Sequence, residues 1–217
     1  MSSEGHLPGF DGATGWLNSP PLTAADVGGK VVLVDFWTYT CINWLRTLPY
    51  VCAWADKYHD RGLVTVGVHT PEFPFEQDVD NVRQAAKDMR IEYPIAIDSD
   101  FVVWRAFSNH YWPAVYIADA QGQIRHHQFG EGRYEECERV IQRLLREAGA
   151  EGVGDPLFSV AAEFRGSSRL DQPGVARDVP RLRANSELRV PRWCRVRRVS
   201  NVRRARLVEA QPLGSLR

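Results

Sequence analysis

The residue best placed for chemistry in this sequence is Cys41. It follows a nearly continuous apolar run, residues 31–37, and comes directly before a segment with helical periodicity. The N-terminus of a helix presents unpaired N–H groups and a partial positive charge, and both stabilise a thiolate. The thiolate is the form of cysteine that attacks disulfides and peroxides. We therefore interpret Cys41 as a candidate redox nucleophile, in preference to the buried apolar filler that a lone free cysteine more often is.

The other three cysteines do not form an evident cluster with Cys41. Successive cysteines are separated by 11, 85 and 57 residues, which matches neither a zinc pattern nor a compact disulfide framework. Cys52 belongs to the same expected helix as Cys41, about 16 Å further along by helical rise, whereas a disulfide needs Cα atoms within about 7 Å. Cys137 is expected to pack in the core. Cys194 lies in a basic C-terminal region and is given little weight as a partner.

The histidines and acidic residues do not indicate a metal site. His126 and His127 are neighbours on an expected strand, so their side chains point to opposite faces. His69 and Glu72 flank a proline after another expected strand, near the rim of the site. Solvated loop residues are the simpler interpretation of that pair. We expect no bound metal.

Strands and helices alternate along the first 150 residues and would hold Cys41 at a strand–helix junction. Runs of β-branched residues indicate strands, and apolar residues at spacings of three and four indicate helices. Residues 1–30 are expected to be mostly irregular, with Trp16 and Leu17 as anchors on the main body. The alternation predicts an α/β sandwich with a mostly parallel sheet, to which a late hairpin adds antiparallel strands. The expected strands are 31–37, 63–69, 94–97, 113–117 and 124–129, and the expected helices are 42–59, 78–90, 99–107 and 134–148.

Charge divides the chain into two regions of different composition. Residues 1–150 contain 13 basic and 20 acidic residues, whereas residues 151–217 contain 14 basic residues, all of them Arg, and 7 acidic ones. A basic segment can bind nucleic acid or an anionic surface. This one lacks lysine, a motif and an amphipathic period, and a shifted reading frame explains its composition equally well. We expect residues 149–217 to be a poorly structured basic tail, largely disordered and without a defined function, and nucleic acid is not an expected partner.

The sequence contains no apolar stretch of the roughly 18 residues that a membrane-spanning helix needs. Its first ten residues lack the basic and apolar regions of a secretory signal, so the expected location is cytoplasmic. About 44% of the residues are hydrophobic and 25% are charged, which is typical of a folded domain and excludes wholesale disorder.

The segment 31–49, VVLVDFWTYTCINWLRTLP, resembles the active-site segment of thioredoxin-fold proteins. It is closest to the TlpA-like and redoxin branch, the group that also covers AhpC/TSA-type domains. The resemblance covers residues 7–148 and implies a three-layer sandwich with a central mixed sheet, thiol–disulfide oxidoreductase activity and no organic cofactor. Segments 67–73, 93–98, 111–116 and 124–132 fit the same branch.

Three residues match functional positions of this family. Cys41 matches the first, nucleophilic cysteine of the family's C-x-x-C motif. Asp35 matches an acidic residue six positions upstream that helps to move protons at the buried cysteine. Pro113 matches a cis-proline that faces the active site across a groove, where a neighbouring backbone can pair with a bound peptide. These roles are what the resemblance implies for the three residues.

Position 44 departs from the family pattern, because it holds Trp44 instead of the second cysteine. A second thiol normally attacks the mixed disulfide and releases the partner. Three interpretations remain open. The protein is a monothiol enzyme that uses an external resolving thiol, a one-cysteine peroxidase, or a non-catalytic binding module in which Trp44 shields the sulfur. Thr38 fits the T-x-x-C of peroxiredoxins, but Val34 stands where that motif has proline, which weakens the peroxidase interpretation.

Aromatic and hydroxyl side chains surround Cys41 in sequence and would suit an apolar peptide-binding surface. The expected partners are protein or small-molecule thiols and disulfides, and peroxide under the second interpretation. The candidate substrate groove consists of Trp37, Thr38, Tyr39, Thr40, Trp44 and Trp112.

Overall fold

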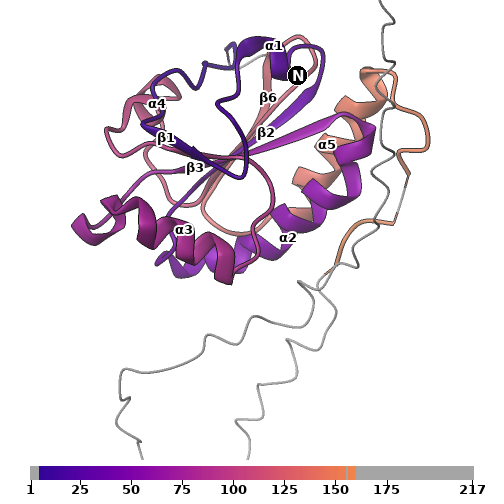
Figure 1. Ribbon diagram of the computed structural model, residues 1–217. Coiled ribbons are helices and arrows are strands. Elements are labelled where there is room, and N and C mark those ends of the chain that lie inside the picture. The colour runs from indigo at the N-terminus through magenta and orange to yellow at the C-terminus, as the bar shows by residue number, and fades with distance from the viewer. Residues whose placement is uncertain (1–4, 155, 160–217) are drawn as a thin grey trace, which may run out of the picture.

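The computed structural model describes residues 5–154 and 156–159, which form a six-stranded sheet with helices on both faces (Figure 1). The order of the strands is β1-β4-β3-β2-β5-β6. Two 3₁₀ turns, His59–Arg61 and Pro74–Gln77, connect longer elements. The elements are β1 (Gly15–Leu17), α1 (Ala24–Val27), β2 (Val31–Trp37), α2 (Ile42–Tyr58), β3 (Leu63–His69), α3 (Val79–Asp88), β4 (Ile95–Ile97), α4 (Val102–Ala106), β5 (Ala114–Ala118), β6 (Ile124–Phe129) and α5 (Tyr134–Glu147).

The sheet is mixed, as expected. Strands β2, β3 and β4 are parallel, whereas β1 pairs antiparallel with β4, and β5 pairs antiparallel with both β2 and β6. All seven residues of β2 are buried, because this central strand is covered on both faces. The carboxyl ends of the three parallel strands and the start of β5 therefore meet at one edge of the sheet.

Two apolar clusters fill the layers on either side of the sheet. Helices α2, α3 and α5 pack against one face, where Leu33 and Ile117 point inward. Helix α4 and the N-terminal segment cover the other face, onto which Val34 and Phe36 project. Alternate residues of β2 thus point into opposite layers, because successive side chains of a strand point to opposite faces of the sheet. This arrangement confirms the three-layer α/β sandwich.

The N-terminal segment is more ordered than its composition suggests. Residues 15–17 form strand β1 and pair with β4, although the sequence predicts irregular structure there. Neighbouring Gly, Ser and Asn residues hide the signal of a strand only three residues long, and its pairing with β4 is a tertiary contact. Leu17 is buried and Trp16 packs against a core cluster, which confirms both as anchors.

Helix α4 begins three residues later than predicted. Phe101, directly before it, adopts a left-handed backbone with φ of 58°. The carboxylate of Asp98 accepts hydrogen bonds from the backbone nitrogens of Val103 and Trp104, at 3.0 and 2.8 Å. Asp98 therefore satisfies the free N–H groups of the first turn, so the helix starts at Val102.

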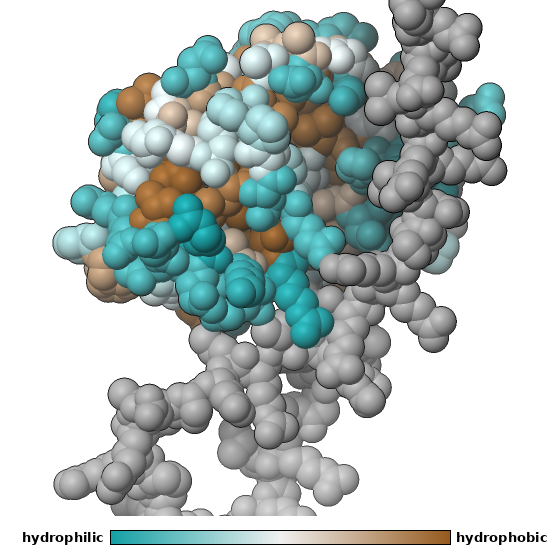
Figure 2. Space-filling view, viewed as in Figure 1, coloured by the Kyte–Doolittle hydropathy of each residue, from teal (hydrophilic) through white to brown (hydrophobic). Residues whose placement is uncertain are grey.

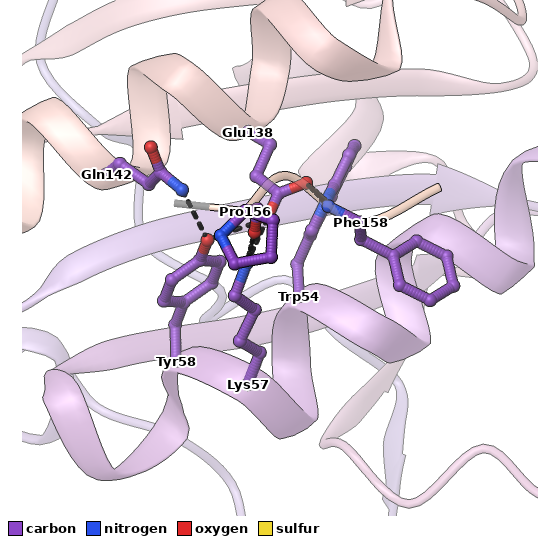
Figure 3. Close-up of polar contacts among 7 residues, drawn as sticks. All are labelled: Trp54, Lys57, Tyr58, Glu138, Gln142, Pro156 and Phe158. Atoms are coloured by element: carbon purple, nitrogen blue, oxygen red, sulfur yellow. Dashed lines mark hydrogen bonds and ion pairs between the residues drawn. The ribbon is translucent and has the colours of Figure 1, made fainter. Parts of the chain in front are cut away.

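Packing continues beyond residue 148, the expected end of the domain. Val153 is buried in the core cluster that contains Tyr58. The buried carboxylate of Glu138 accepts hydrogen bonds from Trp54 Nε1, Lys57 Nζ and Tyr58 Oη of α2 and from the backbone nitrogen of Phe158 (Figure 3). Glu138 belongs to α5, and Lys57 Nζ also donates to the carbonyl of Pro156 at 2.6 Å, so residues 156–158 are held against α5 and α2 and the packed body extends at least to Phe158.

Within the described residues, no helix is long and apolar enough to cross a membrane. The basic tail expected from the sequence lies almost entirely in residues 160–217, outside the described part of the chain.

Candidate active site

Cys41 lies at the start of α2, directly after the turn that leaves β2. It is the N-cap residue of the helix, and its carbonyl oxygen accepts a hydrogen bond from Leu45 N at 3.0 Å. Its own backbone nitrogen donates to the carbonyl of Thr38 at 3.2 Å, which closes the turn. The side chain is half-buried and its thiol is free. The structure thus places a free, partly accessible thiol at the strand–helix junction predicted from the sequence.

Trp44 fills the interior beside this junction. Its side chain is fully buried, and its ring stacks on Trp37 with centroids 4.4 Å apart and planes at 21°. Its Nε1 donates a hydrogen bond to Asp35 Oδ2 at 2.9 Å. The position where the related motif has a resolving thiol is therefore occupied by an indole with a defined partner.

Asp35 lies in the middle of the central strand and is fully buried. Burial raises the pKa of this carboxyl to about 7, and hydrogen bonds from Trp44 and Tyr93 limit the rise. A carboxyl with such a pKa exchanges its proton near neutral pH, which suits general acid or base work. The bond from Trp44 links this carboxyl to the helix that Cys41 begins.

The bond between Trp112 and Pro113 is cis, as the resemblance implies. In the sheet register Phe36 lies opposite Ala114, so Pro113 comes next to the end of β2. Trp112 Nε1 donates to the carbonyl of Thr70 at 3.0 Å, which fastens this loop to the end of β3. The proline loop and the cysteine turn therefore lie at the same edge of the sheet.

The candidate groove residues do not all reach the surface. Trp37, Thr38 and Trp44 are fully buried, which corrects their expected place in the groove lining: they lie beneath it. Tyr39 and Trp112 are half-buried and Thr40 is exposed, so these three present surface. Large apolar side chains that are exposed near the site include Ile42, next to Cys41, at 58%. Figure 2 shows that hydrophobic side chains on the face viewed there form patches between hydrophilic ones.

His69 is not the solvated loop residue expected from the sequence. It ends β3 opposite Trp37, is fully buried, and stacks on the ring of Tyr39 with centroids 5.8 Å apart. Burial lowers its pKa to about 4, so the imidazole is neutral at neutral pH. The expected strand already included residue 69, but β3 pairs there with both β2 and β4, and this central position in the sheet brings the side chain inside. Glu72 is exposed, as expected.

Glu76 is a site residue that the sequence interpretation missed. Its side chain is buried and accepts a hydrogen bond from Thr40 Oγ1 at 2.5 Å, one residue before Cys41. The sequence does contain a signal for this role. Glu76 comes three residues after Phe73 in a turn that begins with proline, which is the pattern of a carboxylate that caps a helix.

Two of the remaining cysteines lie away from the turn. Cys137 is buried on α5, with its Sγ 3.6 Å from His126 Nε2, and burial raises the pKa of its thiol to about 12. This confirms its expected role in core packing. Cys52 is half-buried on α2, and Cys194 is outside the described residues. Within the described part of the chain, no group of three or more His, Cys, Asp or Glu could hold a metal ion.

Comparisons with known proteins agree with this geometry. The family model "AhpC/TSA family" matches residues 7–127. Protein DipZ of Mycobacterium bovis is 46% identical over 151 residues, covering 68% of this chain and 22% of DipZ. The chain thus spans about a fifth of the length of that relative.

Two further relatives match over nearly their whole length. The thiol-disulfide oxidoreductase YkuV of Bacillus subtilis is 34% identical over 141 residues, covering 65% of this chain and 95% of YkuV. The solution structure of a thioredoxin-like protein in the oxidized form is 33% identical with a TM-score of 0.57, covering 67% of this chain and 94% of that one.

Proposed function

The chain belongs to the AhpC/TSA family and has a thioredoxin-like fold, and on that premise we propose that it performs thiol–disulfide exchange through Cys41 alone, with an external thiol as the resolving partner. The observation that carries the proposal is the contrast between positions 41 and 44. Cys41 is a free, half-buried thiol at the start of α2, whereas Trp44 is sealed in the core and bonded to Asp35.

The first step joins Cys41 to the substrate. The Cys41 thiolate attacks one sulfur of the substrate disulfide, the substrate S–S bond breaks, and the departing sulfur leaves as a thiolate that takes a proton from water. The product is a mixed disulfide between Cys41 and the substrate. Cys41 is the N-cap residue of α2, so the attacking sulfur lies at the positive end of the helix dipole.

The second step needs a thiol from outside the site. With Trp44 in place, no thiol follows Cys41 in the first turn of α2. A thiolate of another molecule attacks the substrate sulfur of the mixed disulfide, forms a new disulfide with it and releases the Cys41 thiolate. The protein therefore holds its partner until that thiol arrives.

The loop at Pro113 is proposed to hold the polypeptide that carries the disulfide. It lies beside the end of β2, and the half-buried Trp112 fixes it to Thr70. The name of the relative from Bacillus subtilis, a thiol-disulfide oxidoreductase, supports disulfide-containing partners for this chain as well. The cytoplasmic location stays a prediction, to be checked by fractionation of cells that express the full chain.

The test mixes the reduced protein with a disulfide-linked peptide and follows Cys41 by mass spectrometry. We expect a mixed disulfide at Cys41 that persists until glutathione is added, and none in Cys41→Ser. Loss of the adduct with release of both reduced peptide chains before any thiol is added would contradict the monothiol mechanism. Absence of the adduct, together with sulfenic acid at Cys41 after peroxide, would identify a one-cysteine peroxidase. Absence of both products would identify a non-catalytic binding module.

A further inference from the structure

Glu76 is a buried carboxylate that lacks a cationic partner. Glu76 is 1% exposed, and no ion pair links its carboxylate to a basic residue in the part of the chain that the structure describes. Burying a carboxylate costs free energy unless hydrogen bonds replace the lost water. Buried ionisable side chains of this kind are frequent at functional sites.

Hydrogen bonds from two directions satisfy this carboxylate. Oε1 accepts from Thr40 Oγ1 at 2.5 Å, and Oε2 accepts from the backbone nitrogens of Glu72 and Phe73 at 2.7 and 2.9 Å. Burial by itself would raise the pKa of Glu76, but the hydroxyls of Thr38 and Thr40 and the backbone N–H groups outweigh it and lower the pKa. Glu76 is therefore ionised at neutral pH.

These bonds fasten two turns to each other. One turn, residues 38–41, ends at Cys41, and the other, residues 73–77, follows β3. A second bond joins the same turns, because Tyr39 Oη donates to the carbonyl of Phe75 at 3.3 Å. The position of the second turn relative to the cysteine is thus set by Thr40–Glu76 and Tyr39–Phe75 together.

The second turn carries an exposed aromatic pair. Phe73 and Phe75 are 46% and 54% exposed, and their rings stack with centroids 5.6 Å apart and planes at 4°. Exposed aromatic rings are unfavourable in water and are typical of contact surfaces. The ring of Tyr39 lies 6.3 Å from that of Phe75 and connects the pair to the cysteine turn.

We propose that Glu76 is a positioning residue that holds the Phe73–Phe75 pair beside Cys41, so that the site selects target sulfurs with an aromatic or apolar group next to them. The selectivity for disulfides rests on the proposed function. The placement of the aromatic pair beside the thiol does not rest on that function, because the rate at which any reagent reacts with Cys41 is sensitive to the neighbouring rings.

The experiment compares two alkylating reagents on the full-length protein. Iodoacetamide and N-benzyl iodoacetamide carry the same reactive group, so the ratio of their rates at Cys41 cancels changes in the reactivity of the sulfur. Rates are measured by mass spectrometry of the Cys41 peptide. The variants are Glu76→Gln, Thr40→Val, their combination, and Thr40→Ser, which keeps the hydroxyl donor. Phe75→Ala removes the ring itself.

Glu138→Gln is the matched control for a merely structural loss. Glu138 is also 1% exposed and accepts side-chain and backbone hydrogen bonds, but its partner Trp54 lies roughly 20 Å beyond Cys41 along α2. This variant also removes a buried carboxylate, together with its ion pair to Lys57, and leaves the cysteine turn untouched.

We expect the wild-type protein to react faster with the benzyl reagent. The ratio should fall about fivefold in Glu76→Gln and in Thr40→Val, and no further in the double variant, because both remove the charge-assisted bond between the carboxylate and the Thr40 hydroxyl. It should be retained in Thr40→Ser and Glu138→Gln, and lost in Phe75→Ala. An unchanged ratio in Glu76→Gln, or an equal fall in Glu138→Gln, would overturn the inference.

A second arm separates this inference from the proposed function. Disulfide-linked peptides with Phe or Ser next to the cysteine are offered to the same variants. If no mixed disulfide forms while the benzyl ratio behaves as expected, the proposed function fails and the positioning role stands. If mixed disulfides form but Glu76→Gln discriminates between the peptides as the wild type does, the positioning role fails and the function stands.

Discussion

The indole nitrogen of Trp44 lies 2.9 Å from Oδ2 of Asp35 and donates a hydrogen bond to it in the closed interior of the protein. The bond ties the middle of the central strand to the first turn of α2, where Cys41 lies. It also gives the carboxyl a partner in the space where the family motif has a thiol. Changes to this pair of residues should therefore affect the stability of the protein, the binding of a proton by Asp35 and the chemistry of the thiol site.

Replacing Trp44 by Phe should destabilise the protein more at pH 8 than at pH 5. The variant loses part of the ring and the N–H donor, and together these losses should lower the free energy of unfolding by about 2–3 kcal/mol. The hydrogen bond lowers the pKa of Asp35, so its loss costs most when the carboxyl is ionised. Urea unfolding at the two pH values measures the difference.

Trp37→Phe is the control for this prediction. Its ring stacks on the same partner, but its Nε1 has no hydrogen-bond partner among the described residues. The loss of stability in Trp37→Phe should be smaller and independent of pH. An equal pH dependence in both variants would contradict a special role for the bond to Asp35.

Replacing Trp44 by Cys should restore a two-thiol site. A disulfide between Cys41 and the introduced thiol should form on oxidation. Without added thiol, the reduced variant should release its reduced substrate in a single turnover while its own two thiols become a disulfide, which the release of free insulin chains by a stoichiometric amount of protein measures. The exchange removes a buried indole, so the free energy of unfolding should drop by about 3–5 kcal/mol.

Trp44→Ser is the control for the two-thiol variant. It creates a comparable cavity without a thiol, so it should lose the same stability without releasing reduced substrate in the absence of added thiol. Such release by Trp44→Ser would point to a different resolving group.

Asp35→Asn should become more stable relative to the wild type as the pH rises from about 4 to 7. Burial raises the pKa of Asp35 from its ordinary value of 3.8 to about 7 in the fold, so in this window the folded state keeps a proton that the unfolded chain has released. Wild-type stability from this group therefore falls with rising pH, by up to about 1.4 kcal/mol per unit. Asparagine cannot titrate, and its amide oxygen still accepts from Trp44.

Urea unfolding of both proteins across this range gives the difference directly. Comparison with the wild type is needed because His69 acts in the opposite sense. Its pKa falls from 6.5 to about 4 in the fold, so its contribution rises with pH between those values. A difference between Asp35→Asn and wild type that stays constant with pH would show that Asp35 has an ordinary pKa.

Cys137 should resist alkylation in the folded protein while Cys41 reacts. The thiol of Cys137 is buried, and burial raises its pKa to about 12, so almost no thiolate is present at pH 8. Mass spectrometry after brief treatment with iodoacetamide should show modification at Cys41 and none at Cys137, with both modified in urea. Early modification of Cys137 would mean that α5 opens readily.

The long strands and helices could be predicted from the sequence because their apolar residues repeat over many positions. Strand β2 reads as a continuous apolar run, and α5 shows Val140, Ile141, Leu144 and Leu145 on one face. Strand β1 has only three residues and exists through its pairing with β4, a contact between residues about 80 positions apart that no local pattern reveals. The start of α4 depends on the side chain of Asp98, which also acts from outside the helix.

The site was predictable where a motif fixes a position, and less so where burial decides the role. The cysteine turn and the cis peptide bond at Pro113 follow from the motif. Whether an aromatic residue lines a groove or lies below it depends on packing from three directions, so Trp37 and Trp44 were expected at the surface and lie inside. Glu76 is 35 residues from Cys41 in sequence, and only the folding of β3 beside β2 brings the two turns together.

The central place of β2 divides the surroundings of Cys41 into segments that open to solvent at different free energies. All seven residues of β2 are buried and paired with β3, and five of them also pair with β5, so we expect their amide hydrogens to exchange only when the whole sheet unfolds. The short turn at residues 74–77 has mostly exposed side chains and few such bonds, so we expect its amides to exchange through local opening. Cys41 then lies between a segment expected to exchange slowly and one expected to exchange fast. We therefore expect that a partner which breaks the bonds of Glu76 and Tyr39 could move this turn while the strand that holds Asp35 stays closed.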